Sequence, residues 1–206
     1  MKDINLYDRV SSVLYPFSGL NKIDPKVLEF AACRGSVCHL LIDSLIGGFG
    51  KYTLDSLVED YCEDLRPGDG IEELIEKERE KVRLMIQSFE KWVEGRVFLP
   101  KPERFFCDDL MITGECDQVT HDGVLIDFKT SYNESPSWIL QGSAYSYMAK
   151  KAYYPIENIE FVQLSKTGGK PRIYTYDENF PLFRAHLDVF RYSYKGAKDI
   201  DVLDFL

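Results

Sequence analysis

The sequence lacks a long apolar run. No stretch of its 206 residues approaches the roughly 20 consecutive apolar residues that a helix needs to cross a bilayer. The N-terminal residues have neither the apolar segment of a signal peptide nor the arginine-rich character of a transit peptide. These absences argue against a membrane protein, and we expect an intracellular one.

Cysteines are few, and their arrangement fits no metal framework. Five occur, which is an odd number, and none forms a Cys-x-x-Cys pair with another. Zinc sites and cysteine-ligated clusters are typically built on such pairs. We therefore expect neither kind of site from these residues, which are Cys33, Cys38, Cys62, Cys107 and Cys116.

Positive charge is also scarce. The chain has 25 lysines and arginines against 34 aspartates and glutamates, for a net charge of −9. Proteins that coat nucleic acid are basic, so this balance argues against that class. An enzyme needs only a local basic track, so the balance is compatible with an enzyme acting on DNA through salt-sensitive contacts.

What the sequence does contain is enough apolar material for one folded core. Hydrophobic residues make up 45% of the chain and aromatic residues 14%, which excludes a disordered chain. Apolar periodicity predicts helices over 25–47, 53–65, 71–94, 136–152 and 179–196, and strands over 96–107, 110–119, 124–130, 158–164 and 173–176. The N-terminal residues 4–20 are expected to be an arm that packs on the core.

This order of elements predicts an α/β fold with a central mixed sheet flanked by helices. We expect a single domain over residues 1–206. Its parts would be a helical region over about 1–95, a sheet core over about 96–178 and a closing helix over about 179–198.

The strands over 110–119 and 124–130 are expected to form a β-hairpin around a turn that ends in Gly123. Side chains alternate along a strand, so Asp127 and Lys129 share the face opposite the apolar residues of the second strand. The hairpin would bring Asp117 of the first strand near Asp127.

Two carboxylates and a lysine would then meet at one place. Hard divalent cations such as Mg²⁺ bind carboxylate oxygens, water and phosphate, and a nearby lysine could hold a water molecule or stabilise charge on a phosphate. The alternative is that Asp127 and Lys129 form an ordinary ion pair on an exposed sheet face, where such pairs contribute little.

A wider set of residues resembles a known family. The set comprises Gly-x-x-Asp, then Asp-x-Lys on the next strand, then Gln-x-x-x-Tyr on the following helix, at Gly114, Asp117, Asp127, Lys129, Gln141 and Tyr145. This order and spacing resemble the RecB-type branch of the PD-(D/E)XK nuclease superfamily. The resemblance implies a restriction-endonuclease-like core. It also implies that the last five residues are catalytic, with Gln141 and Tyr145 placing the DNA strand. The alternative for Tyr145 is an ordinary core aromatic.

The early helix carries a related pattern, Arg34-Gly35-Ser36-x-x-His39. It resembles the helix that in the same nucleases supplies a histidine ligand beside the two acids, which implies a metal site of His39, Asp117 and Asp127. The cofactor would be Mg²⁺ or Mn²⁺, and imidazole tilts the preference toward Mn²⁺. The alternative is a hydrogen-bonded histidine without a metal. Close backbone approach is a plausible reason for Gly35 within a helix.

Some relatives in this branch bind an iron–sulfur cluster through one early and three late cysteines. No cysteine follows Cys116, so we do not expect that cluster here.

Further residues are assigned lesser roles. In the resembled family a glutamate on the first strand often lies close to the metal site, which suggests Glu103, although an exposed edge-strand carboxylate is the alternative. The segment 165–172 is expected to be a flexible basic loop that touches a DNA backbone or is a plain hairpin loop. The candidate contacts to DNA phosphates are Arg34, Ser36, Lys166, Lys170 and Arg172.

The resemblance implies a divalent-metal-dependent DNA nuclease, in first place an exonuclease of DNA recombination, repair or replication. Such enzymes occur in phages and bacteria, so the expected location is the cytoplasm of a bacterium or of a phage-infected host. DNA is the expected partner, together with a recombination or replication protein. The alternatives are a non-catalytic nuclease-fold DNA-binding or regulatory module and a structure-specific endonuclease.

Overall fold

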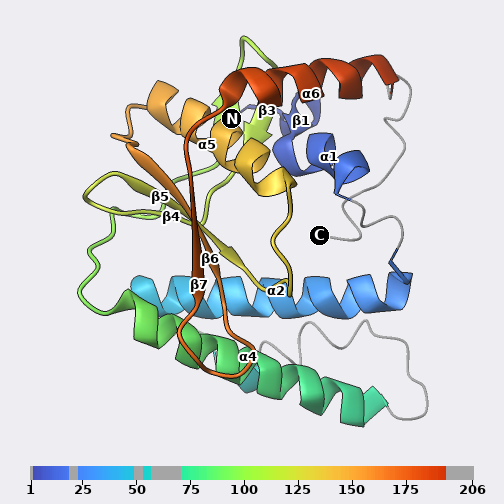
Figure 1. The fold of residues 1–206 in the computed structure, drawn as a ribbon, viewed down its shortest axis with the longest axis vertical. Helices are drawn as coiled ribbons and strands as arrows, with labels where there is room; N and C mark the ends of the chain where they lie inside the picture. Colours follow the sequence, from blue (N-terminus) through green and yellow to red (C-terminus); the bar gives the residue numbers. More distant parts are fainter. Residues whose placement is uncertain (1, 19–22, 49–52, 57–70, 194–206) are drawn as a thin grey trace.

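The computed structural model describes residues 2–18, 23–48, 53–56 and 71–193. Figure 1 shows a sheet with helices on both sides. One side is covered by two long helices, α2 (Pro25–Ile46) and α4 (Ile71–Val93), and the other by α5 (Ser137–Lys151) and α6 (Phe180–Ser193). The predicted α/β class with helices flanking mixed strands is therefore confirmed.

The main sheet has four strands in the order β4 (Gln118–Val119), β5 (Val124–Lys129), β6 (Asn158–Gln163) and β7 (Arg172–Tyr176). β5 is antiparallel to β4 and parallel to β6, and β7 is antiparallel to β6. In this register Lys129 is opposite Gln163, and Gln163 is opposite Arg172. A mixed sheet was the prediction from the sequence.

A second sheet of three strands was not predicted. Its order is β1 (Asp8–Arg9), β3 (Ile112–Gly114) and β2 (Phe105–Cys107). The single strand predicted over 110–119 is therefore wrong, because the chain leaves the three-stranded sheet after Gly114 and enters the main sheet at Gln118. The strand predicted over 96–107 is also too long. Pro100 and Pro102 lack the N–H groups that a ladder needs, and only an isolated bridge at Phe98 precedes β2.

The two faces of the main sheet bury different cores. Ile126, Phe128 and Val162 pack with side chains of α2 and α4, including Val37 and Phe89. Leu125, Ile159 and Phe161 pack instead with side chains of α5 and α6, including Trp138, Phe183 and Leu187. The alternation predicted along β5 is therefore present, and Asp127 and Lys129 fall on the α5 side.

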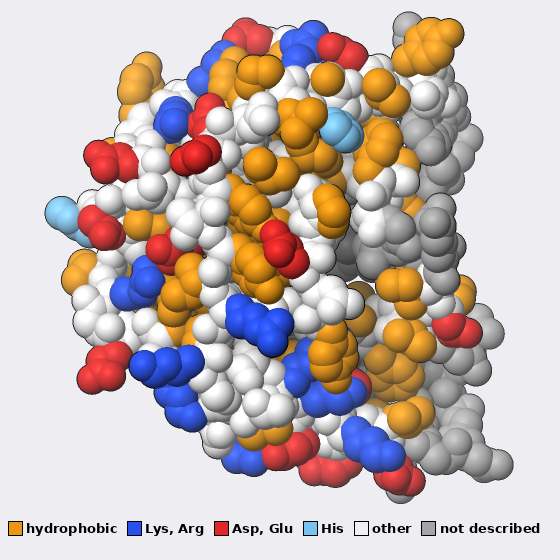
Figure 2. Space-filling view, in the orientation of Figure 1, with side chains coloured by type: hydrophobic (Ala, Val, Ile, Leu, Met, Phe, Trp, Pro, Cys, Tyr) orange, Lys and Arg blue, Asp and Glu red, His pale blue; other side chains and the backbone are white. Residues whose placement is uncertain are grey.

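The space-filling view in Figure 2 shows an apolar band with lysines, arginines and acidic side chains interspersed around it. The positive and negative residues are mixed on this face rather than separated into one basic and one acidic region. Among the described residues no helix is long and apolar enough to cross a membrane.

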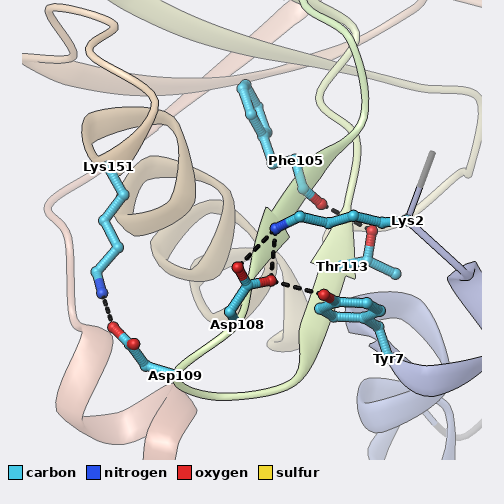
Figure 3. A network of polar contacts seen from close by, with 7 residues as sticks. All are labelled: Lys2, Tyr7, Phe105, Asp108, Asp109, Thr113 and Lys151. Carbon is cyan, nitrogen blue, oxygen red and sulfur yellow. Dashed lines mark hydrogen bonds and ion pairs between the residues drawn. The ribbon is translucent and has the colours of Figure 1, made fainter.

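The N-terminal arm packs on the core, as predicted. It contains two short 3₁₀ turns, η1 (Ile4–Leu6) and η2 (Tyr15–Phe17), and one helix, α1 (Val10–Leu14), whose apolar side chains are buried. Figure 3 shows how the arm is fixed to the second sheet: Lys2 Nζ lies 2.7 Å from Asp108 Oδ2, and the Tyr7 hydroxyl donates to Asp108 Oδ1 at 2.6 Å.

The remaining elements agree with the sequence to within a few residues, with two exceptions. Most of the helical stretch predicted over 53–65 lies outside the described residues, as does the end of the closing helix beyond Ser193. Within α6, Phe183 and Leu187 point into the core as expected.

Candidate active site

Asp117 lies in the break between the two sheets, just before β4. Its N–H still donates to the Ile126 carbonyl at 3.2 Å, but its carboxylate Oδ2 accepts the Phe128 N–H at 2.6 Å. The side chain thus replaces a backbone acceptor of the ladder, and this fixes the carboxylate beside β5. The other oxygen, Oδ1, lies 2.9 Å from Nδ1 of His39 on α2.

Asp127 and Lys129 form the second part of the site. Asp127 Oδ2 lies 2.6 Å from Lys129 Nζ, and Asp127 is only 4% exposed. The lysine also donates to Gln141 Oε1 at 2.8 Å, and Gln141 Nε2 donates to the Tyr145 hydroxyl at 3.1 Å. The pair thus joins a buried carboxylate to a half-buried amine and continues as a polar chain into α5, which contradicts the alternative of an exposed surface ion pair.

Gly114 makes room for this chain. A Cβ atom added at Gly114 would lie 2.4 Å from Cε1 of Tyr145, a distance that no side chain can accept without movement. The glycine therefore allows the Tyr145 ring to lie against β3 with its hydroxyl on Gln141. Tyr145 is a buried core aromatic as well as a member of the polar chain, so both descriptions given from the sequence apply.

Gly35 has no such role. A Cβ atom there would lie 3.6 Å from Thr130 Oγ1, which is an ordinary van der Waals contact. The close backbone approach expected at this position is therefore not what requires glycine. Gly142 on α5 is the glycine that the sequence reading missed: its added Cβ would lie 2.6 Å from Ile159 Cγ2, so α5 packs closely on β6.

The pKa values of the two aspartates are shifted in opposite directions. Burial raises the pKa of Asp127, and the neighbouring Asp117 carboxylate raises it further, against the effect of Lys129. Burial would also raise the pKa of Asp117, but His39 and the Phe128 N–H outweigh it and the pKa lies below its usual value. Two neighbouring carboxylates with pKa values pushed apart are a common feature of functional sites.

The imidazole responds to both acids. Burial acts to lower the pKa of His39, but Asp117 and then Asp127 outweigh it, so the pKa is raised. His39 is therefore in direct contact with Asp117, and Asp127 acts on it electrostatically. A metal site made of these three residues stays a prediction.

These residues have the donor types that Mg²⁺ or Mn²⁺ takes, namely two carboxylates and one imidazole. A bound cation would stabilise the charged form of the buried Asp127 carboxylate, whose pKa burial and Asp117 raise. Within the described ranges, however, no three His, Cys, Asp or Glu side chains are grouped as ready metal ligands. His39 instead contacts Asp117 and Lys129 contacts Asp127; a bound cation would replace part of these contacts.

The lesser candidates differ in exposure. Glu103 is exposed in the segment before β2, and Ser36 is half-buried on α2. Arg34 is 8% exposed and pairs with Glu78 of α4. Lys170 and Arg172 are exposed.

The loop 165–171 is anchored, which differs from the flexible loop expected from the sequence. The Ser165 N–H donates to Ser88 Oγ at 3.0 Å, and Lys91 donates to the Gly168 carbonyl. Gly168 has a φ of 71° and packs against Leu84 and Gln87 of α4. A residue with a side chain would be strained in that conformation, so the glycine holds the loop on the helix.

Asp43 and Lys101 were not identified from the sequence. Asp43 is one turn after His39 on α2, Lys101 contacts its Oδ2, and both interact electrostatically with Asp117. Burial raises the pKa of Asp43, against the effect of Lys101. The i, i+4 spacing from His39 could have placed Asp43 on the same helix face from the sequence. The contact with Lys101 could not be predicted in this way, because the two residues are 58 positions apart.

A cleft of about 560 Å³ lies elsewhere, between α2 and α4. Leu41, Leu45 and Ile86 give it apolar surface, and charged Arg83 and Glu90 line it as well. It contains none of the candidate catalytic residues.

Comparisons with known proteins gave similarity in fold only. No family model matches the chain, and no curated protein matches it. A presumed exonuclease from Eubacterium rectale aligns over 97% of this chain and 82% of its own, with 13% identity and a TM-score of 0.49.

An alkaline exonuclease from Laribacter hongkongensis aligns over 83% of this chain and 94% of its own, with 11% identity and a TM-score of 0.41. A structure of the Laribacter enzyme in complex with dAMP gives 9% identity and a TM-score of 0.35, over 85% of this chain and 96% of that one. These values describe a distant similarity in architecture.

Proposed function

We propose that this protein is a divalent-metal-dependent DNA nuclease, in first place an exonuclease that hydrolyses phosphodiester bonds in DNA recombination, repair or replication. One observation carries the proposal: the partly buried Asp127–Lys129–Gln141–Tyr145 chain lies beside the His39–Asp117 pair. The proximity of these residues from α2, β5, α5 and the segment before β4 supports the proposal.

The acidic part of the site would hold the metal. His39, Asp117 and Asp127 would bind Mg²⁺ or Mn²⁺, which when bound stabilises charge on a phosphate and lowers the pKa of water. Asp117 is already oriented by the Phe128 N–H. A carboxylate fixed in this way needs little reorganisation to bind a cation.

The basic part of the site would act on the phosphate. Lys129 is tethered to Asp127 and Gln141, so its amine is held where it can orient a water molecule or stabilise charge on the phosphate. Gln141 is in turn held by Tyr145. Loss of one such electrostatic group typically costs a factor of about 10²–10³ in rate.

The experiment compares linear and circular DNA. Purified protein is incubated with end-labelled linear single- and double-stranded DNA and with circular forms, in Mn²⁺, in Mg²⁺ and in EDTA. Metal-dependent degradation of linear DNA with intact circles is the expected result. Cleavage of circles would identify an endonuclease instead.

A second candidate is a non-catalytic DNA-binding or regulatory module on a nuclease fold. The observation that favours it is that both aspartates already have protein partners, because His39 contacts Asp117 and Lys129 contacts Asp127. The net charge of −9 also favours it. Calorimetry with Mn²⁺ distinguishes the two: a nuclease binds the ion and loses binding in Asp117→Asn, whereas the module binds none.

A further inference from the structure

A cluster of excess positive charge lies where α2, α4 and the loop after β6 meet. Arg34 of α2 contacts one oxygen of Glu78, and Lys81 of α4 contacts the other. Lys166 from the loop interacts electrostatically with all three. Three cations therefore lie near one carboxylate, which only Arg34 and Lys81 contact, in a chain whose net charge is −9.

Lys166 is not satisfied within this cluster. Its Nζ is buried and makes no hydrogen bond to any described residue, and the Nε of Arg34 is in the same condition. Burial lowers the pKa of Lys166 to about 8, and Arg34 and Lys81 add to the effect. Buried polar groups without partners are rare in native proteins and call for an explanation.

The amine is covered by an aromatic ring. Lys166 Nζ lies 3.1 Å from the ring centroid of Tyr132, while Tyr132 itself is 67% exposed. A cation over an aromatic face gains some stabilisation, but a single ring does not replace hydrogen bonds to an anion. Because Tyr132 is mostly in solvent, its side chain can rotate away at small cost and uncover the amine.

The members of the cluster are close in sequence to residues of the candidate active site. Arg34 precedes His39 by five residues on α2, which is about 7.5 Å along the helix axis. Tyr132 follows Lys129 by three residues, and Lys166 follows the end of β6 by the same interval. The loop that carries Lys166 is fixed to α4 by the Ser165 and Gly168 contacts, so the amine is held in place.

We propose that Lys166, Arg34 and Lys81 form an anion site that holds a phosphate of the bound DNA strand beside the one at the active site, with Tyr132 as its movable cover. The inference rests on the proposed function for its ligand. The proposed site does not include Lys170 and Arg172, which are exposed.

The first test uses inorganic phosphate as the probe. Thermal midpoints are measured in EDTA at constant ionic strength while phosphate replaces chloride. The wild type is expected to show a saturable rise of about 2–4 °C, and Lys166→Met should abolish the rise. Methionine keeps most of the buried stem, so the fold should survive; Lys81→Met is a second variant with a weakened response.

The control is Lys77→Met. Lys77 is on α4 one turn before Lys81 and pairs with Glu73, so it loses the same charge outside the cluster and should keep the full phosphate response. Tyr132→Ala should bind phosphate more tightly than the wild type because the amine is uncovered. No response in the wild type, or one that Lys166→Met leaves intact, would overturn the proposal.

The second test uses a single-stranded oligonucleotide, with fluorescence anisotropy over a range of salt in the presence of EDTA. Lys166→Met should weaken binding about tenfold and reduce the slope of log K against log salt by about 0.7. Unchanged DNA affinity would overturn the assignment to DNA. A wild type that responds to phosphate but cleaves no DNA in metal would instead overturn the proposed nuclease and leave the anion site standing.

Discussion

The two faces of β5 make an instructive comparison. Ile126 and Phe128 on one face are buried among apolar side chains of α2 and α4. On the other face, buried Asp127 and half-buried Lys129 belong to a polar chain that continues to Gln141 of α5. Alternate residues of β5 thus belong to the apolar core on one face and to the candidate active site on the other. The first face should determine stability, and the second should determine activity with little benefit to stability.

The apolar face is where the largest effect on folding is expected. Phe128 is 1% exposed and contacts Phe89 and Trp92 edge to face. Phe128→Ala should lower the free energy of unfolding by about 3–5 kcal/mol, through lost burial and a cavity. Urea denaturation followed by circular dichroism measures this; a loss below about 1 kcal/mol would show that this face is not a packed core.

The polar face should give the opposite signature. Asp127→Asn removes a buried carboxylate whose pKa is raised, so stability should be maintained or increased in metal-free buffer. Nuclease activity should fall by a factor of about 10²–10³ or more. Parallel denaturation and cleavage assays test the comparison, which fails if both properties decline together.

A pair of glycines sharpens the comparison. Gly114→Ala places a Cβ 2.4 Å from the Tyr145 ring, so it should cost about 1–3 kcal/mol of stability and displace the Gln141–Tyr145 end of the chain. Gly35→Ala is the matched control, since its Cβ meets only an ordinary contact at 3.6 Å and the change should add up to about 1 kcal/mol in a helix interior. Equal outcomes for the two variants would contradict the geometry.

The smallest effect is expected from His39, and it depends on pH. Its pKa is raised mainly by Asp117, so its stabilising contribution is complete below about pH 6.5 and is lost as pH rises through the folded-state value. In EDTA, the difference in thermal midpoint between wild type and His39→Gln should be largest near pH 6 and shrink toward pH 9. His121→Gln, in the exposed turn, is the control; a difference that grows with pH would contradict the pairing.

Much of this comparison could be predicted from local sequence. The alternation along β5 follows from a period of two, and the long helices follow from apolar spacing. The contact of His39 with Asp117 was implied only by the family resemblance, since no local pattern relates the helix to the strands.

The rest depended on contacts that leave no local trace. The chain leaves one sheet after Gly114 and joins another at Gln118, and between the two the Asp117 side chain accepts the Phe128 N–H. A hydrophobicity pattern does not predict such a side-chain contact. The contact of buried Arg34 with half-buried Glu78 likewise joins residues 44 positions apart, and no local pattern in the sequence marks it.

The most direct measurement is the cleavage of end-labelled linear DNA in Mn²⁺ by wild type and by Asp127→Asn, each with an EDTA control. The account predicts metal-dependent degradation by the wild type and a loss of at least about 10²-fold in the folded variant. Equal cleavage by both proteins, or no cleavage by the wild type in any metal, would contradict the placement of nuclease chemistry at β5.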